Sequence, residues 1–387
     1  MQIAHPQIST IVALILVAAP LATPPGVYAQ AGPAPATVAG NAGGFDFSGV
    51  DAFWPVYESL RRGDEPSPAA WDAVFATLGY AALEARERRR ASLEVAMRLA
   101  FSPSRVTARD SALKTNTFTA RATRHLMGIP AARDSIERFR GVLASSRVID
   151  AARRRVAAFV PRGLADSVPP PPVALVFFLD DGRGYPTVIV GDLLRLARAG
   201  ADTGYLAHEF YHSYRRRFAA AYRAHSPADA GVEELLAYPV EEGTADQLDK
   251  VAYAQLRDSA FAIYMKRPGA PAYAPEYRAN FAKAAEWMAM VSRTLERAAA
   301  NPDSASQIAR AARDSLPDSG RPLGAFMAWT IGRLRGRDAL IRSGGDQYQF
   351  WLYYETTARD AALEGTVLPR LSPAALAVIR RLVRQYR

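Results

Sequence analysis

Apolar residues recur every three or four positions through most of the 387-residue chain, which is the spacing of one buried face of an α-helix. The segment AALEARERRRASLEVAMRLAF, residues 81–101, has this spacing. In SPAAWDAVF, residues 67–75, a serine followed by a proline marks a helix start, because serine caps helices and proline fits the first turn. The pattern predicts a mainly helical protein.

One stretch departs from this pattern. Residues 169–194, PPPPVALVFFLDDGRGYPTVIVGDLL, contain two apolar runs, 173–179 and 187–190, separated by a turn rich in Gly and Asp. Both runs are rich in β-branched and aromatic residues, which favours a β-hairpin or a short sheet. Helical patterns then resume and continue to Arg387. We therefore expect a mainly α (α+β) fold: a helical domain with a small β-sheet or hairpin.

The first 44 residues differ from the rest in composition. IVALILVAA, residues 11–19, is an apolar run too short to span a bilayer, and VYA, residues 27–29, offers the small residues that a signal peptidase reads. AGPAPATVAGNAGG, residues 31–44, has low complexity and little to bury. We predict a signal peptide at 1–29, cleavage after Ala29 and a disordered linker at 30–44. The protein would be exported, periplasmic or secreted, with no stable membrane span.

We expect residues 45–387 to form a single mostly helical domain. Its parts would be a helical N-terminal part at 45–165, a core at 166–260 that holds the sheet and the candidate site, and a helical C-terminal part at 261–387.

The stretch with the most chemical content is YLAHEFYHSYRR, residues 205–216, which contains His208, Glu209 and His212. Residues four apart lie on one face of a helix, so both imidazoles can face one metal ion. Glu209 lies close enough to act as a general base without binding the metal. The alternative for this motif taken alone is a surface helix that carries two histidines.

Two histidines leave a zinc site one protein ligand short. The metzincin pattern would place a glycine and a third histidine at positions occupied by Arg215 and Phe218, so that branch is excluded. The third ligand must come from a second helix, and four glutamates are candidates: Glu233, Glu234, Glu241 and Glu242.

Spacing and context favour different glutamates. Glu233 and Glu234 lie at the distance beyond His212 that is familiar from thermolysin-type and aminopeptidase-type enzymes. Glu242 lies in EEGTAD and has Asp246 one helical step later, where a carboxylate can orient a metal-bound imidazole. The other three glutamates have Ala or Tyr at that step. We choose Glu242, and residues 226–238 would then be an insertion between the two site helices.

HEFYH followed by EEGTAD resembles the gluzincin zinc metallopeptidases, the class that contains thermolysin and the membrane-alanyl-type aminopeptidases. From about residue 46 to 361 the chain is also similar to a family of exported bacterial zinc-dependent peptidases with a domain of unknown function. That similarity includes SPAAWDAVFATLGYAAL, RPLGAFMAWTI and YQFWLYYETTA. The resemblance implies a gluzincin-like fold, with the sheet packed beside the His-Glu-x-x-His helix.

Site roles follow from the same resemblance. It implies one Zn²⁺ per chain bound by His208, His212 and Glu242, with Glu209 as catalytic base and Asp246 as the orienting carboxylate. It also implies an edge strand, 173–179 or 187–190, that holds an extended peptide. A further group must stabilise the oxyanion, and four residues stay open for this role: Tyr353, Tyr354, Arg321 and His225.

We predict zinc-dependent hydrolysis of peptide bonds in a peptide or protein substrate, by a metal-activated water with Glu209 as general base. No motif for an N-terminal amine stands out, which favours an endopeptidase or oligopeptidase. The chain has no cysteine, which removes thiol nucleophiles, disulfides and cysteine-bound metals.

Two alternatives remain. One is a non-peptidase hydrolase or an inactive zinc-binding exported protein, and the other is a basic helical scaffold that binds polyanions through arginine. The net charge of +10 is compatible with the scaffold, but the arginines are dispersed, so nucleic acid is not an expected partner.

Overall fold

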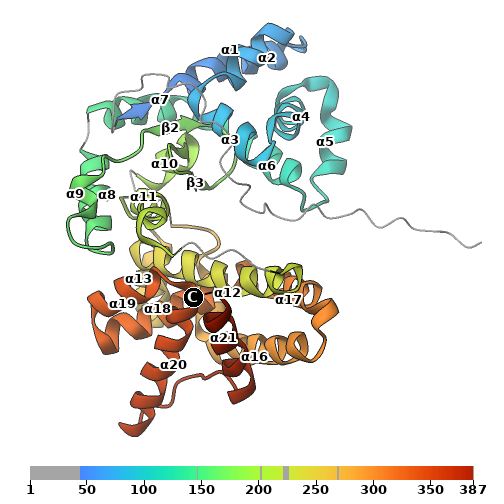
Figure 1. Ribbon diagram of the computed structural model, residues 1–387. Coiled ribbons are helices and arrows are strands. Elements are labelled where there is room, and N and C mark those ends of the chain that lie inside the picture. Colours follow the sequence, from blue (N-terminus) through green and yellow to red (C-terminus); the bar gives the residue numbers. More distant parts are fainter. Residues whose placement is uncertain (1–43, 146, 201–202, 221–225, 268–269, 387) are drawn as a thin grey trace, which may run out of the picture. The chain divides into compact units, whose positions relative to one another are not determined.

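A computed structural model of the chain describes residues 44–145, 147–200, 203–220, 226–267 and 270–386. These residues belong to one compact unit, Ala36–Arg387. The predicted signal peptide lies outside the described residues, and so does the predicted linker apart from Gly44. Helices dominate, and a small four-stranded sheet lies among them, so the mainly α (α+β) fold is confirmed (Figure 1).

Among the described residues, ten helices lie between the short first strand and the strands that form the centre of the sheet. They are α1 (Ser48–Arg62), α2 (Pro68–Phe75), α3 (Leu78–Glu87), α4 (Arg90–Phe101), the 3-10 helix η1 (Pro103–Arg105), α5 (Val106–Ala112), α6 (Phe118–Leu126), α7 (Ile129–Ser145), α8 (Val148–Ala157) and α9 (Leu164–Ser167). The predicted start of α2 is confirmed, because the Ser67 side chain accepts a hydrogen bond from the Ala70 backbone and Pro68 opens the helix.

The sheet contains β1 (Phe45–Asp46), β2 (Val173–Val176), β3 (Gly182–Gly184) and β4 (Ile189–Asp192), in the order β1-β2-β4-β3. Of the two predicted arrangements of the apolar runs, the short sheet is confirmed and the hairpin is wrong, because β2 and β4 pair in parallel. The antiparallel partner of β4 is β3, a segment that the sequence indicated as a turn. All residues of β2 and β4 are buried. A strand buried on both faces does not alternate apolar and polar residues, which explains the apolar runs at 173–179 and 187–190.

The middle of the chain contains the two longest helices around the candidate site. The elements are α10 (Leu193–Ala199), α11 (Thr203–Phe218), α12 (Pro227–Ala245), the 3-10 helix η2 (Asp246–Leu248), α13 (Val251–Ala254) and α14 (Asp258–Met265). The predicted insertion at 226–238 is wrong. Ser226 caps α12, and the residues after it form the first turns of the helix that carries Glu242.

The C-terminal part is again helical. It contains α15 (Ala274–Ala282), α16 (Ala284–Ala300), η3 (Pro302–Ser304), α17 (Ala305–Ser315), η4 (Pro317–Gly320), α18 (Arg321–Arg335), α19 (Arg337–Gly344), α20 (Gln347–Leu363) and α21 (Pro373–Tyr386). Within the described ranges, no helix combines the length and the apolar character that crossing a bilayer requires.

Two large apolar cores meet at the candidate site. The first core contains the sheet, the N-terminal helices and residues of α11 such as Phe210 and Tyr214. The second contains the C-terminal helices and residues of α12 such as Leu236 and Val240, and a smaller third core joins α13, α15 and α18. Helix α11 therefore packs in the first core, whereas α12 packs mainly in the second and reaches the first at Ala245, and the two helices contact each other (Figure 1).

Two glycines let α12 and α18 cross at close range. A Cβ atom at Gly243 would lie 2.1 Å from the backbone carbon of Gly324, and a Cβ at Gly324 would lie 1.7 Å from the carbonyl oxygen of Pro239. Only glycine allows backbones to approach this closely. The crossing brings the first turn of α18, which begins at Arg321, beside Glu242.

Candidate metal centre

Helix α11 carries the His-Glu-x-x-His residues on a buried turn. His208, Glu209 and His212 are only 3%, 5% and 7% exposed, although all three are polar. The Nε2 atoms of the two histidines lie 3.1 Å apart. Buried polar groups need partners, so this turn cannot be an ordinary surface helix that happens to carry histidines.

Helix α12 brings a carboxylate to the same point. The two oxygens of Glu242 lie 3.5 Å from the Nε2 atoms, Oε2 from His208 and Oε1 from His212. Four ligands at about 2.1 Å around a tetrahedral zinc ion lie about 3.4 Å from one another. The three observed separations, 3.1, 3.5 and 3.5 Å, therefore fit a single zinc ion, and two imidazoles with one carboxylate are a donor set that zinc accepts.

The other three glutamates lie elsewhere. Glu234 is paired with Arg310 and Arg313 of α17, and Glu233 accepts a hydrogen bond from Gln347. Glu241 lies next to the site but contacts the far side of an imidazole, with Oε1 3.3 Å from Nδ1 of His212. Among the described residues, the cluster of possible metal ligands that includes both histidines contains Glu242 alone of the four.

Glu241 has an electrostatic environment that keeps it charged. Burial would raise the pKa of Glu241, but the hydrogen bond with His212 and the charge of Arg215 outweigh burial and lower this pKa to about 2. Burial also lowers the pKa of the His212 imidazole, more than Glu241 raises it. A neutral imidazole is the form that binds a metal.

His208 has two carboxylates behind it. Oδ1 of Asp246 lies 3.4 Å from its Nδ1, and Oδ1 of Asp249 lies 3.2 Å from the same atom. Asp246 was predicted from the sequence and Asp249 was not, because α-helical spacing was expected to continue through this point. The α-helix ends at Ala245 and tightens into the 3-10 helix η2, which turns a residue three positions after Asp246 toward the same imidazole. The repeated acidic residues in DQLD were the available signal.

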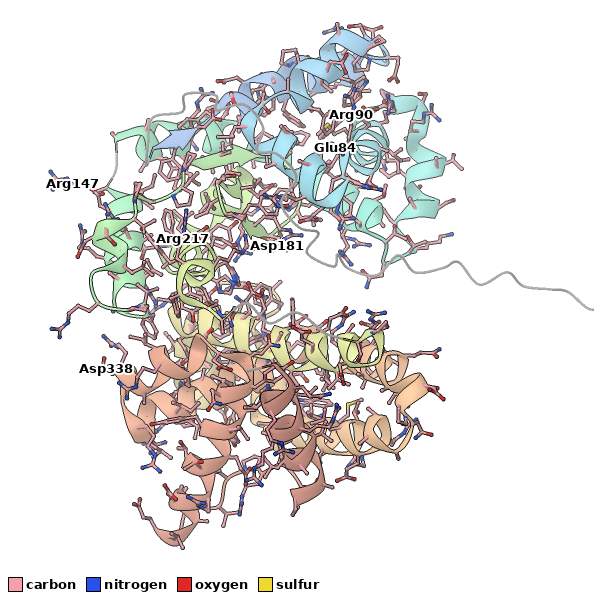
Figure 2. The ribbon with its side chains drawn as sticks, viewed as in Figure 1. Glu84, Arg90, Arg147, Asp181, Arg217 and Asp338 are labelled. Carbon is pink, nitrogen blue, oxygen red and sulfur yellow. The ribbon has the colours of Figure 1, made fainter. Side chains whose placement is uncertain are left out.

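The edge strand beside Glu209 is β3. Both strands proposed from the sequence as the peptide-binding edge are wrong, because β2 and β4 are interior strands of the sheet. A Cβ atom at Gly182 would lie 2.8 Å from Oε1 of Glu209, and one at Gly184 would lie 2.5 Å from the Glu209 carbonyl oxygen. The Gly-Arg-Gly strand thus lies directly on the turn that carries Glu209. Asp181, labelled in Figure 2, immediately precedes this strand.

The four residues named for the oxyanion lie in different places. The Arg321 guanidinium contacts the Glu242 carboxylate, and its Nε lies 3.8 Å from Oδ2 of Asp246. Tyr354 is buried in the second core and donates a hydrogen bond to the Pro369 carbonyl. Tyr353 packs against the same core, and His225 lies outside the described residues. Of the three that the structure describes, Arg321 is the residue that lies at the site.

A family comparison bears on this geometry. Residues 71–362 match the family described as putative zinc dependent peptidase (DUF5700). The chain belongs to this family. The match confirms the similarity to a zinc-peptidase family of unknown function and includes both site helices and the outer motifs from Trp71 onward. No curated protein and no solved structure matches the chain.

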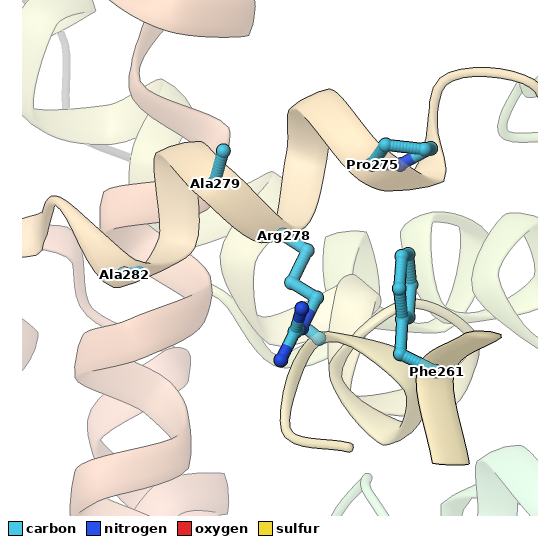
Figure 3. A pocket seen from close by; sticks show the side chains of 6 residues that line it. Phe261, Pro275, Arg278, Ala279 and Ala282 are labelled. Carbon is cyan, nitrogen blue, oxygen red and sulfur yellow. The ribbon is translucent and has the colours of Figure 1, made fainter. Parts of the chain in front are cut away.

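The family description connects the chain with zinc and with peptide hydrolysis, and the cluster of His208, His212 and Glu242 has the ligands that zinc needs. Two surface pockets lie apart from these residues. A pocket of about 350 Å³ is lined by Ala254, Phe261, Pro275, Arg278, Ala279 and Ala282 (Figure 3). Arg278 stacks over Phe261 there and donates to the Leu256 carbonyl, so its charged group is already engaged.

Proposed function

We propose that the protein is a zinc-dependent peptidase that hydrolyses peptide bonds. The observation that carries the proposal is the convergence of two imidazole Nε2 atoms and one carboxylate from separate helices, with the buried Glu209 beside them. His208, His212 and Glu242 would hold one zinc ion per chain. Bound zinc would act as a Lewis acid, making a water nucleophilic near neutral pH and polarising a carbonyl group.

Glu209 supplies the base. It directly follows His208 and is buried, and it is not part of the cluster of possible metal ligands. Glu209 accepts the proton of the attacking water and later donates it to the leaving amine. Burial supports this role, because a carboxylate in a water-poor setting transfers protons more effectively than one that is fully solvated.

The position of β3 supports binding of an extended peptide. An edge strand offers backbone N–H and C=O groups to a further strand. At Gly182 the N–H donates to the Asp181 carboxylate and the carbonyl accepts from the Arg183 guanidinium, so a peptide that adds there would displace these side-chain contacts. Because β3 lies on the Glu209 turn, a peptide aligned along it would bring a carbonyl group near the base. Arg321, which contacts Glu242, would supply positive charge to the oxyanion that forms during attack.

The test combines metal content with cleavage. Purified protein is supplied with zinc, its bound metal is measured, and a diverse peptide library is incubated with it and analysed by mass spectrometry. We expect one zinc ion per chain, cleavage with zinc, and loss of cleavage after chelation. Glu209→Gln should retain zinc and lose turnover by at least about 100-fold, within the range that a general base contributes. Glu286→Gln, an exposed site on α16, is the control.

Each failure has a distinct meaning. Absence of bound zinc after supplementation would end the proposal. Zinc binding without cleavage of any peptide would favour an inactive zinc-binding relative. Loss of zinc from Glu209→Gln would show that Glu209 is a ligand rather than the base.

We also propose that the chain is exported and loses residues 1–29. The support is the short apolar run at 11–19 with small residues before the expected cleavage point. N-terminal sequencing of protein recovered from the periplasm or medium should begin at Gln30. Recovery of the intact chain from the cytoplasm alone would contradict export.

A further inference from the structure

The strongest unexplained feature beside the metal ligands is a buried lysine. Lys250 is one of four lysines in the chain and is only 5% exposed. Its Nζ lies 2.7 Å from Oδ1 of Asp246 and 2.8 Å from Oδ2 of Asp249. An ammonium group loses strong hydration on burial, so a lysine in this position must be held by its partners.

These contacts form a chain of groups that ends at a metal-ligand imidazole. Asp249 contacts Nδ1 of His208 with one oxygen and Lys250 with the other. Asp246 contacts Lys250 through Oδ1, while its Oδ2 accepts a hydrogen bond of 2.6 Å from the Tyr277 hydroxyl. Both carboxylates therefore have every oxygen engaged, and Lys250 is the cationic side chain that donates to both.

Charge explains why the lysine is needed. His208, Asp246 and Asp249 lie close enough together to hold a cation, since one ligand atom from each lies within 4.8 Å of the others. Two carboxylates buried at that separation repel each other unless a positive charge lies between them. Burial opposes the charged form of Lys250, but Asp246 and Asp249 outweigh burial and raise its pKa well above the usual range. Lys250 is thus the resident cation of this group.

The second imidazole is held differently. His212 has one carboxylate at its Nδ1, Glu241, with the positive charge of Arg215 near it. His208 has two carboxylates at Nδ1 and one shared lysine. Substitutions can therefore change the groups that hold His208 without changing those that hold His212.

We propose that Lys250 is a positioning residue of the metal centre, which holds Asp246 and Asp249 in place so that Asp249 fixes the His208 imidazole toward the metal. The inference rests on the metal site of the proposed function and not on hydrolysis itself. Carboxylates that orient metal-bound imidazoles change metal affinity by roughly 10- to 100-fold when they are removed. Lys250 acts one contact further away, through those carboxylates.

The test measures zinc affinity by competition with a chromophoric chelator, so it needs no substrate. Lys250→Met keeps the length of the side chain and removes its charge, and we expect affinity to fall roughly 10- to 100-fold. Lys250→Met with Asp246→Asn removes one charge of each sign and should recover most of the affinity. Lys250→Met with Asp249→Asn should not recover it, because the acceptor at 3.2 Å from His208 Nδ1 is no longer charged. Lys283→Met, at an exposed lysine, is the matched control and should bind like the wild type.

A purely structural lysine would give another pattern. In that case Lys250→Met would lower the melting temperature of the metal-free protein without changing the zinc affinity of the folded fraction. That result would overturn the inference about Lys250 but leave the proposed metal site standing. Failure of the wild type to bind zinc would overturn the metal site and the inference with it. If Lys250→Met does not fold, Asp249→Asn and Asp246→Asn carry the test. A larger loss of zinc affinity for Asp249→Asn supports the inference, and equal affinities contradict it.

Discussion

Glu241 and Glu242 are adjacent in sequence but face different atoms of the site. Neighbouring residues on a helix point about 100° apart, so Glu242 reaches both Nε2 atoms while Glu241 reaches Nδ1 of His212 from the side. On the proposed zinc site, two glutamates in a row would therefore serve as a ligand and as an orienting group. Glu234, two turns earlier on the same helix, has neither role because Arg310 and Arg313 hold it.

This arrangement predicts a graded series of zinc affinities. Glu242→Gln should weaken zinc binding by more than about 100-fold, because it removes a charged ligand. Glu241→Gln should weaken binding by roughly 10- to 100-fold, the range for groups that orient a ligand. Glu234→Gln on the same helix should leave zinc affinity unchanged. Competition titrations of the three purified variants measure this order, and an equal loss for Glu234→Gln would contradict the ligand assignment.

How far the sequence predicted the site depended on which element held each residue. His208, His212 and the pairing of Glu242 with Asp246 followed from α-helical spacing, which holds through α11 and most of α12. Asp249 and Lys250 could not be found in this way, because the helix tightens into η2 just before them. Arg321 was one of four candidates for the oxyanion, and choosing it required the α12–α18 crossing at two glycines, a contact between segments about 80 residues apart that local periodicity does not encode.

At the scale of elements, β3 is the least predictable part of the fold. The segment has two glycines and one arginine, so neither strand propensity nor alternation marks it as a strand. Its glycines are needed for contact with α11: a Cβ atom at Gly184 would lie 2.5 Å from the Glu209 carbonyl oxygen and 2.9 Å from Cβ of His212. Tertiary packing thus selects residues that local preference would place in a turn.

Gly184→Ala should therefore push β3 away from α11. We expect a loss of roughly 1–3 kcal/mol in the free energy of unfolding, the range for overpacking. Gly141→Ala is the control, for which we expect the free energy of unfolding to increase rather than decrease. Gly141 is exposed in α7 with open space around it, so alanine there should stabilise by roughly 0.5–1 kcal/mol. Chemical denaturation of both variants measures the difference, and equal effects would show that β3 has room to adjust.

A buried histidine joins α6 to the junction between β4 and α10. Nε2 of His125 in α6 lies 2.9 Å from Oδ1 of Asp192, which ends β4 and caps α10. Burial opposes protonation of His125, but the Asp192 carboxylate outweighs burial and raises its pKa. A raised folded-state pKa contributes stability that is complete below the unfolded pKa of about 6.5 and is lost as pH rises through the folded pKa.

His125→Gln should therefore cost more stability in mildly acidic solution than in alkaline solution. Denaturant unfolding of wild type and variant, each with chelator present, would be compared at about pH 5.5 and about pH 9. The difference in the free energy of unfolding should be larger at the lower pH. A difference independent of pH would mean that His125 contributes by packing alone.

At the scale of the whole molecule, zinc would connect the two large cores. His208 and His212 lie on α11, which packs into the first core, and Glu242 lies on α12, which packs mainly into the second. A ligand that binds only the folded state stabilises it by about 2.7 kcal/mol at a concentration 100 times its dissociation constant. Bound zinc should therefore oppose separation of the cores as well as local unfolding.

Zinc should raise the melting temperature of the wild type and chelation should lower it. The shift should disappear in Glu242→Gln, which leaves both histidines on one helix but removes the ligand from the other core. Differential scanning calorimetry with and without zinc measures this. A full zinc-dependent shift in the variant would mean that the metal binds within α11 alone.

The division of the ligands between two cores has a consequence for newly made chains. A partly folded molecule with only the first core formed would present two imidazoles, while α12 would lack most of the contacts that place Glu242, and two imidazoles alone are not sufficient for tight zinc binding. The capacity to cut other polypeptides would thus arise only once the entire molecule is assembled. Nascent copies crowded together during synthesis and transport would be protected from one another without a separate inhibitory segment.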